Sequence, residues 1–471
     1  MNVKALGIYL GKDLRIGVLF QYAMQGADII NRFVADEKFI AQPHAPTLSA
    51  SFEAATPREQ EIFWRDIRAV PFNGRSSVRD KSWLLPSFFQ NLLPEGVFRD
   101  HVAELRQCDP KDHFEILAAC GRDLPGNVYA LPLELTRDQL ATYVTQNADA
   151  LEMTVTAEPM EEGMSLSGVQ PKLGVIREGD RYVGRTKDHD THIIAKLPVV
   201  GQPNLPELEH LSLQLAAAAG VSVCEAYLEP LEVLAVEHGY DLGDANGKTN
   251  FLAVIRYDRF PGGRIHCEDF AQVLGEMPED KYLGAQASYL SVAAALLGFP
   301  SLGEPAVHEL LRRLMVNELL GNSDMHLKNI GLRYPDGITP EFPPAYDIVG
   351  YAALSKRSGH ALQIMPRETP PKPGKARSAE GGRPAKPSLT PAVLRAFTSA
   401  LGIPEKPAQR VLRDCVKAAH EHWPAMIGKS LLTAQQKERL SAHFLSHPMI
   451  QSLERRVQLA AARDTPCPNQ M

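Results

Sequence analysis

The sequence of 471 residues predicts an α+β fold with two lobes, the first rich in strands and the second helical, and an additional α/β domain before them. Three observations lead to this expectation. Apolar strand patterns dominate residues 150–262, helical patterns dominate residues 263–465, and residues 1–140 open with a hairpin pattern of their own. We therefore expect three domains with these boundaries.

The composition is typical of a soluble globular protein, with 44% hydrophobic and 23% charged residues. The net charge of −6 gives no overall basic surface, so we do not expect the chain to bind DNA directly by charge. The six cysteines are scattered without a C-x-x-C pair, and no window reaches about 18 consecutive apolar residues. We therefore expect a cytoplasmic protein with reduced thiols, no membrane span and no secretory signal.

The N-terminal domain is expected to begin with a β-hairpin, because the strand patterns Lys4–Leu10 and Leu14–Phe20 are separated by a Gly-Lys turn. The aromatic-rich stretch Ser82–Gly96 suggests a buried helix or an exposed docking surface, and ordinary core packing is the commoner alternative. Asp112–Cys120 predicts a helix that closes this region.

The strand-rich lobe begins with a small, polar, glycine-containing loop, Ser165–Gly174. Main-chain N–H groups of such a loop suit close approach to phosphates, although a simple hairpin is the commoner explanation. Lys196 follows in the apolar strand HIIAKLP, and lysine is seldom buried without a partner. This lysine either reaches nucleotide phosphates or lies at the end of the strand, facing water.

The pattern at Leu205–Ala219 predicts a helix. Glu209 on this helix is a candidate to pair with Lys196 and hold the amine for the phosphates, or else it is a solvated helix residue. Two apolar strands are predicted at Val221–Leu228 and Phe251–Tyr257. The second is well placed for a hinge strand that offers main-chain groups to adenine.

The helical lobe is predicted to contain helices at Asp269–Leu274, Tyr289–Leu297 and Glu304–Leu320. Gly321 is a plausible C-cap for the third helix. Ile330–Tyr334 then predicts a short strand, from which the chain returns as a hairpin.

The basic segment Thr369–Pro391, rich in proline and glycine, interrupts the helical pattern. We expect a mobile surface loop, and a solvated linker is favoured over a contact with an acidic partner. Closing helices are predicted at Pro391–Leu401, Pro407–Trp423 and Ala434–Ala461.

The octet NSDMHLKN carries the strongest chemical signal. Asp324 and Asn329 are five residues apart, the spacing at which a kinase catalytic loop places its base and a metal ligand, and Asp347 follows in PPAYDIV. An acceptor hydroxyl needs a carboxylate to orient it and take its proton, and Mg²⁺ needs hard oxygen ligands such as those of Asn329 and Asp347. The alternative is a helix-terminating loop with polar capping residues.

Motifs along most of the chain resemble the HipA-type serine/threonine kinases, the toxins of bacterial toxin–antitoxin pairs. They follow one another in the order that is typical of this family: FFQNLLPEG, DLPGNV, SLSGVQPKL, HIIAKLP, LEHLSLQLA, VIRYDR, HCEDFAQVLG, NSDMHLKN and PAYDIV. The resemblance implies a two-lobed protein-kinase-like fold with a HipA N-terminal domain.

The resemblance also implies a role for individual residues. Asp324 would be the catalytic base, Asn329 and Asp347 would bind Mg²⁺, and Glu209 would support Lys196. Contacts with ATP are implied for the following residues: Ser167, Gly168, Val169, Gln170, Lys172, Lys196, Ile255, Tyr257 and His326.

In a member of this family the kinase can phosphorylate a serine of its own phosphate loop, which drives the loop out and switches the kinase off. Ser165 is the matching position for this autophosphorylation, with Ser167 as the close competitor. A phosphate would add a charge of about −2 beside the nucleotide phosphates and repel them.

Two residues depart from the family pattern. Ile255 replaces a frequent Glu in the hinge, and Pro171 before Lys172 stiffens the loop and removes one N–H donor.

The partners implied by the resemblance are a HipB-like helix-turn-helix antitoxin and operator DNA, which the chain would reach through the antitoxin complex. The implied protein substrate is an aminoacyl-tRNA synthetase, which is glutamyl-tRNA synthetase in the best-known case.

Two alternative functions stay open. One is a small-molecule kinase, since sugar and antibiotic kinases share the Asp-x-x-x-x-Asn loop. The other is a non-catalytic corepressor whose kinase fold only binds an antitoxin.

Overall fold

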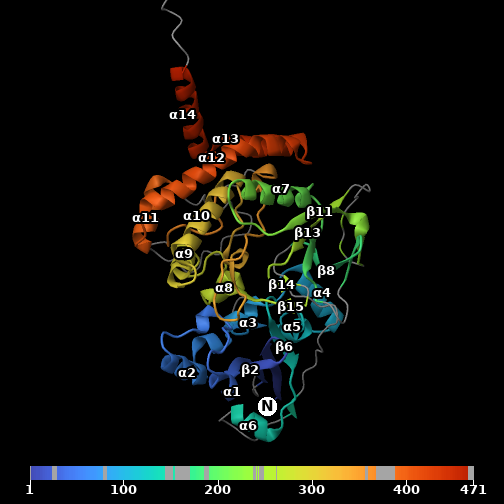
Figure 1. Ribbon diagram of the computed structural model, residues 1–471. Helices are drawn as coiled ribbons and strands as arrows, with labels where there is room; N and C mark the ends of the chain where they lie inside the picture. The colour runs from blue at the N-terminus through green and yellow to red at the C-terminus, as the bar shows by residue number, and fades with distance from the viewer. Residues whose placement is uncertain are drawn as a thin grey trace, which may run out of the picture.

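The computed structural model has three parts that follow one another along the chain (Figure 1). The N-terminal domain lies at one end of the molecule, the two lobes lie in the middle, and the last helices lie at the other end. No helix in the described part of the chain has the length and apolar character needed to cross a membrane. The described part comprises residues 2–23, 29–77, 82–143, 152–153, 170–184, 190–236, 240, 242, 249–260, 262–355, 359–366 and 388–464.

A five-stranded sheet forms the centre of the N-terminal domain. β1 (Asn2–Leu10) and β2 (Leu14–Ala23) pair as the predicted antiparallel hairpin. The sheet order is β3-β2-β1-β6, and β7 pairs with β1 in parallel. The other strands of this domain are β3 (Ile29–Ala35), β4 (Ser76–Ser77), β5 (Ser82–Trp83), β6 (Val128–Pro132) and β7 (Glu152–Met153).

Short helices and an aromatic core accompany this sheet. Within the stretch Ser82–Gly96, Phe88 and Phe89 are fully buried. Ordinary core packing therefore explains most of its apolar character, and an exposed docking surface is the wrong interpretation. The helices are α1 (Glu37–Ile40), α2 (Pro57–Arg65), α3 (Ser87–Asn91), α4 (Val97–Arg106), α5 (His113–Cys120) and α6 (Arg137–Tyr143).

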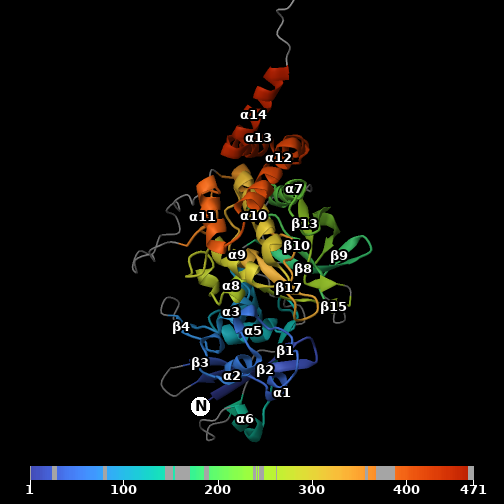
Figure 2. The same ribbon diagram turned by 60° about the vertical axis from the view of Figure 1, so that its left-hand side comes forward.

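The first lobe contains a six-stranded sheet in the order β11-β13-β10-β8-β9-β12. Its strands are β8 (Lys172–Glu178), β9 (Arg181–Val183), β10 (Ile193–Lys196), β11 (Ala226–Pro230), β12 (Leu234–Ala235) and β13 (Asn250–Ile255). The helix α7 (Leu205–Ala218) packs on β13 and β11 (Figure 1), and Figure 2 shows it beside β13 from a second direction. The strand predicted at Val221–Leu228 begins only at Ala226, because Val223 pairs instead with Ala345 of the second lobe.

The central helix of the second lobe is α10 (Gly303–Leu320), and it packs against α7, α9 and further helices. Gly321 ends it in the left-handed conformation (φ 65°), as predicted for a C-cap. The strand β17 (Gly331–Tyr334) pairs with β16 (His266–Asp269). Its main pairing partner therefore lies before α10 in the chain, whereas the predicted hairpin would have paired it with the segment that follows. The two short strands before β16 are β14 (Arg259–Phe260) and β15 (Gly263–Arg264).

The closing helices depart from the prediction at one point. The single helix predicted at Ala434–Ala461 is two helices, because Pro448 lacks an N–H and disfavours a helical conformation at His447, which is extended. The remaining helices of this lobe are α8 (Phe270–Val273), α9 (Tyr289–Gly298), α11 (Pro391–Leu401), α12 (Glu405–Lys429), α13 (Ala434–Ser446) and α14 (Pro448–Asp464). Residues 369–387 of the predicted insertion lie outside the described part of the chain.

Candidate active site

A pocket of about 170 Å³ lies between the two lobes and reaches the N-terminal domain. The residues that line it include six that the sequence predicted to bind a nucleotide or metal: Lys172, Lys196, Ile255, Tyr257, Asn329 and Asp347. The N-terminal domain contributes four residues that the sequence did not predict: Asn91, Leu92, Leu93 and Pro125. The pocket therefore draws on all three parts of the chain.

Lys196 is held between two carboxylates at the end of β10. Its Nζ atom lies 2.6 Å from Oε1 of Glu209 and also donates to Oδ1 of Asp347. Burial alone would lower the pKa of Lys196, but the two carboxylates raise it above its ordinary value, so the amine is charged. Burial raises the pKa of Glu209, and the charge of Lys196 opposes this effect. Neither Lys196 nor Glu209 faces water.

Asn329 links the two aspartates of the site. Its Nδ2 atom donates to Oδ2 of Asp347 at 2.8 Å and to the main-chain oxygen of Asp324 at 2.9 Å. Burial works against ionisation of Asp347, but Lys196 and Lys172 hold its pKa below the usual range. Asp347 has a φ of 56°, a left-handed conformation that costs a non-glycine residue energy and often marks functional sites.

Asp324 lies beside a tyrosine that the sequence did not single out. The hydroxyl of Tyr282 donates to Oδ1 of Asp324 at 2.5 Å, and its ring stands at 88° to the ring of His326 with 4.8 Å between centroids. Asn322 Oδ1 accepts a hydrogen bond from the Asp324 main-chain N–H, a turn contact within the loop that follows α10. Burial, reinforced by Lys281, lowers the pKa of His326 to about 3, and the imidazole is neutral.

The described end of the predicted phosphate loop is joined to β10. Gln170 Nε2 donates to the main-chain oxygen of Leu197 at 3.1 Å, and the Leu197 N–H donates to the oxygen of Pro171 at 2.9 Å. Burial, and then the nearby charge of Lys196, lowers the pKa of Lys172 to about 8. The other predicted loop residues lie outside the described part of the chain: Ser165, Ser167, Gly168 and Val169.

The predicted hinge strand, Phe251–Tyr257, consists of β13 from its second residue onward and the two residues that follow it. The main-chain N–H of Ile255 donates to Glu225 and that of Arg256 donates to His192, each at 2.9 Å. These two donors are therefore used within the sheet. Tyr257 is the next residue, and its N–H makes no hydrogen bond with any residue that the structure describes. Its ring stacks on Tyr346 with 5.3 Å between centroids.

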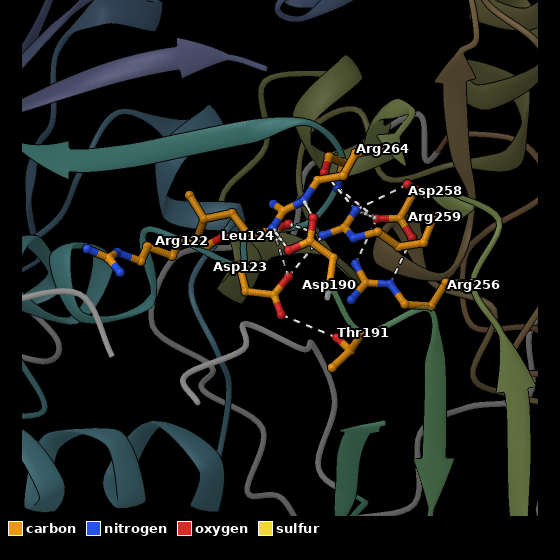
Figure 3. A network of polar contacts seen from close by, with 10 residues as sticks. Arg122, Asp123, Leu124, Asp190, Thr191, Arg256, Asp258, Arg259 and Arg264 are labelled. Carbon is orange, nitrogen blue, oxygen red and sulfur yellow. Dashed lines mark hydrogen bonds and ion pairs between the residues drawn. The ribbon is translucent and has the colours of Figure 1, made fainter. Parts of the chain in front are cut away.

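The charged residues of VIRYDR fasten the hinge to the N-terminal domain (Figure 3). Asp258 accepts hydrogen bonds from Arg256, Arg259 and the main-chain N–H of Gly126. Arg259 also donates to Asp123 at 3.1 Å and to the main-chain oxygen of Gly126 at 2.7 Å. The three arginines and two aspartates that make the core of this network are buried: Arg256, Arg259, Arg264, Asp123 and Asp258.

The N-terminal domain also contacts the octet directly. Lys328 Nζ donates to the main-chain oxygen of Asn91 at 2.8 Å and to Oδ2 of Asp269 at 2.9 Å. Glu95 forms an ion pair with Lys281 at 2.7 Å. Asn91 and Glu95 lie in the quoted motif FFQNLLPEG, but no spacing in the sequence assigned them to the site, since their contacts depend on how the domains pack.

The side chains fit a magnesium nucleotide. In the described part of the chain no cluster of three or more His, Cys, Asp or Glu residues forms a metal cage. Mg²⁺ typically binds through one or two protein oxygens together with water and phosphate oxygens, and the adjacent Asn329 and Asp347 supply such ligands. His326 Nδ1 is buried without a hydrogen-bond partner among the described residues, as expected of a group that contacts a ligand.

Comparisons with known proteins agree with this architecture. Family models for the HipA N-terminal domain and the HipA-like C-terminal domain match residues 7–131 and 164–423. The candidate kinase Y4dM of Sinorhizobium fredii is 34% identical over 322 residues, which cover 67% of this chain and 71% of Y4dM. The candidate kinase Y4mE of the same organism is 31% identical over 326 residues, which cover 64% of this chain and 71% of Y4mE.

A solved structure of Shewanella oneidensis HipA, in a complex with HipB and its operator DNA, has a similar fold. Its TM-score is 0.61 at 19% identity, and the alignment covers 98% of this chain and 100% of that chain. At this identity the likeness shows the fold alone. The predicted α+β fold, with two lobes and an N-terminal domain, is confirmed.

Proposed function

This chain belongs to the HipA family, and from this premise we propose that it is an ATP- and Mg²⁺-dependent serine/threonine-protein kinase, the toxin of a HipBA-type toxin–antitoxin pair. One observation carries the proposal. Asn329 bridges the main-chain oxygen of Asp324 and the carboxylate of Asp347, and Asp347 in turn contacts Lys196. This arrangement supports the proposal that Asp324 is the base, that Asn329 and Asp347 are oxygen ligands of the metal, and that Lys196 is the charged amine of phosphoryl transfer.

In the proposed mechanism the protein positions the reactants and balances charge. Bound Mg²⁺ would neutralise negative charge on the β- and γ-phosphates. Asn329 and Asp347 hold the metal, and Lys196, which is kept charged by its carboxylate partners, binds the phosphates. Asp324 orients the acceptor hydroxyl and takes its proton.

The hinge and the phosphate loop complete the nucleotide site. Tyr257 offers its main-chain N–H to adenine, since the N–H groups of Ile255 and Arg256 already donate within the sheet. Lys172 and Gln170 bind the phosphates together with Ser167, Gly168 and Val169 of the loop. Autophosphorylation of Ser165 would switch the kinase off, because the added charge repels the nucleotide phosphates.

The proposed partners follow from family membership. A HipB-like helix-turn-helix antitoxin binds the chain, and the complex reaches operator DNA through that antitoxin. The Shewanella HipA complex is the precedent for this arrangement. The proposed protein substrate is an aminoacyl-tRNA synthetase, whose phosphorylation would arrest growth.

Phosphopeptide mapping after brief induction tests the proposal, with wild type compared to Asp324→Asn in the same host. The proposal expects a phosphoserine on a synthetase with wild type and none with the variant. Transfer to a metabolite but to no protein would show a small-molecule kinase. Normal antitoxin binding and toxicity with Asp324→Asn would show a non-catalytic corepressor.

A further inference from the structure

The hydroxyl of Tyr282 contacts the carboxylate of Asp324, the proposed base. Tyr282 follows the short 3-10 helix Pro278–Asp280, in a stretch of chain without regular structure, and its hydroxyl lies 2.5 Å from Oδ1 of Asp324. The His326 ring contacts the Tyr282 ring edge to face, and the tyrosine also packs on the core of the second lobe. These contacts fix the ring, so the hydroxyl is held at the carboxylate.

A chain of contacts connects this tyrosine to the N-terminal domain. Lys281, the neighbour of Tyr282, pairs with Glu95 of the FFQNLLPEG motif at 2.7 Å, and each side chain is less than one fifth exposed. The main-chain oxygen of Lys281 accepts from the N–H of Leu327 in the octet at 3.4 Å. Burial works against ionisation of Glu95, but Lys328 and Lys281 hold its pKa below the ordinary value.

We propose that Tyr282 is a positioning residue that fixes the carboxylate of Asp324, and that Glu95 of the N-terminal domain keeps Tyr282 in place through Lys281. The inference deepens the proposed kinase function and depends on it. A carboxylate that is bound at one oxygen by a fixed hydroxyl cannot rotate freely, so it stays oriented toward the acceptor. Orientation of this kind contributes to the rate of transfer and not to nucleotide affinity.

The test measures nucleotide binding and phosphoryl transfer separately on the full-length chain. A fluorescent ATP analogue reports the dissociation constant, and radiolabelled γ-phosphate reports autophosphorylation at saturating Mg·ATP. Tyr282→Phe should lower the transfer rate by about 10- to 100-fold while the dissociation constant changes less than about twofold. Tyr227→Phe is the matched control, because it removes a hydroxyl that also contacts a carboxylate, Glu225, and should leave both values unchanged.

Glu95→Gln tests the link to the N-terminal domain. The transfer rate should fall by about 3- to 10-fold, and the double variant with Tyr282→Phe should be no slower than Tyr282→Phe alone, because both changes act through one contact. An unchanged or faster rate with Tyr282→Phe would overturn the inference, as would additive losses in the double variant. Absence of transfer by wild type would instead contradict the proposed function itself.

Discussion

The Nζ atom of Lys196 lies 2.6 Å from Oε1 of Glu209, and both side chains are almost completely buried. One residue ends β10 and the other lies in α7, so the pair joins the sheet of the first lobe to the helix that packs on it. Asp347 of the second lobe contacts the same amine. This arrangement keeps a positive charge at the place where the proposed kinase binds phosphate.

Removing Glu209 from its pair with Lys196 should lower the stability of the folded protein. Glu209→Leu leaves a buried charge undercompensated, and the free energy of unfolding should fall by about 3 to 5 kcal/mol. The double variant Lys196→Met with Glu209→Leu should regain part of that loss without regaining nucleotide affinity. Urea denaturation measures the free energies of unfolding, and titration with an ATP analogue measures the affinity. Arg333→Met is the control for stability, since the surface pair of Arg333 with Glu341 should contribute less than about 1 kcal/mol. A Glu209→Leu loss as small as the control's would contradict the account.

Nucleotide affinity should depend on pH through Lys172. Because its pKa in the protein is lowered to about 8, the amine loses its charge as the pH rises through 8, whereas an ordinary lysine would stay charged to about 10. Affinity for an ATP analogue should therefore fall by up to about tenfold per pH unit above 8. In Lys172→Arg, whose guanidinium stays charged, the fall should be absent. The same pH dependence in both proteins would assign it to another group.

Gly126 should be irreplaceable where the N-terminal domain meets the hinge. Its φ is 68°, and an added Cβ would lie 2.7 Å from the main-chain nitrogen of Cys267. Gly126→Ala should lower the free energy of unfolding by roughly 2 to 5 kcal/mol, because it combines left-handed strain with a clash against main chain. Gly402 has the same φ with open space around it, so Gly402→Ala isolates the strain and should cost about 1 to 2 kcal/mol. Equal losses would show that the close packing at Cys267 contributes nothing.

Glu268 should make stability depend on pH. Burial raises its pKa to about 7 from 4.5, although Ser49, Tyr334 and the Ala50 N–H donate hydrogen bonds that oppose the shift. Between these two values the folded chain keeps a proton that the unfolded chain has released, so this group makes the protein less stable as pH rises from 4.5 to 7. Urea denaturation should show that the free energy of unfolding of Glu268→Gln, relative to that of wild type, rises by up to roughly 3 kcal/mol between pH 4.5 and pH 8. If the difference in free energy of unfolding between wild type and Glu268→Gln were the same at both pH values, the prediction would be wrong.

Local signals explain which parts of the fold were predictable. The hairpin of β1 and β2, the helix α10 and its cap at Gly321 follow from strand and helix patterns that act over a few residues. The exception at Ala434–Ala461 is also local, since Pro448 should have divided that helix.

Local signals in the sequence likewise predict some residues of the candidate site and not others. Lys196 and the octet stand out as a cation within an apolar strand and as a spaced pair of polar residues. By contrast, Asn91 and Glu95 reach the site only because the N-terminal domain packs against the second lobe, and no spacing in the chain encodes contacts between residues 237 and 186 positions apart. Tyr282 reaches Asp324 within the second lobe, across 42 positions that carry no periodic signal linking the two residues. The strand at Ala226 starts late for the same reason, because its predicted first residues pair with the second lobe.

The central claim is tested most directly by comparing wild type with Asp324→Asn for γ-phosphate transfer and for binding of an ATP analogue in the presence of Mg²⁺. The account predicts that wild type transfers phosphate to serine, and that the variant binds the nucleotide within about threefold of wild type but transfers at least about 100-fold more slowly. Transfer by the variant at the wild-type rate would contradict the assignment of Asp324 as the base.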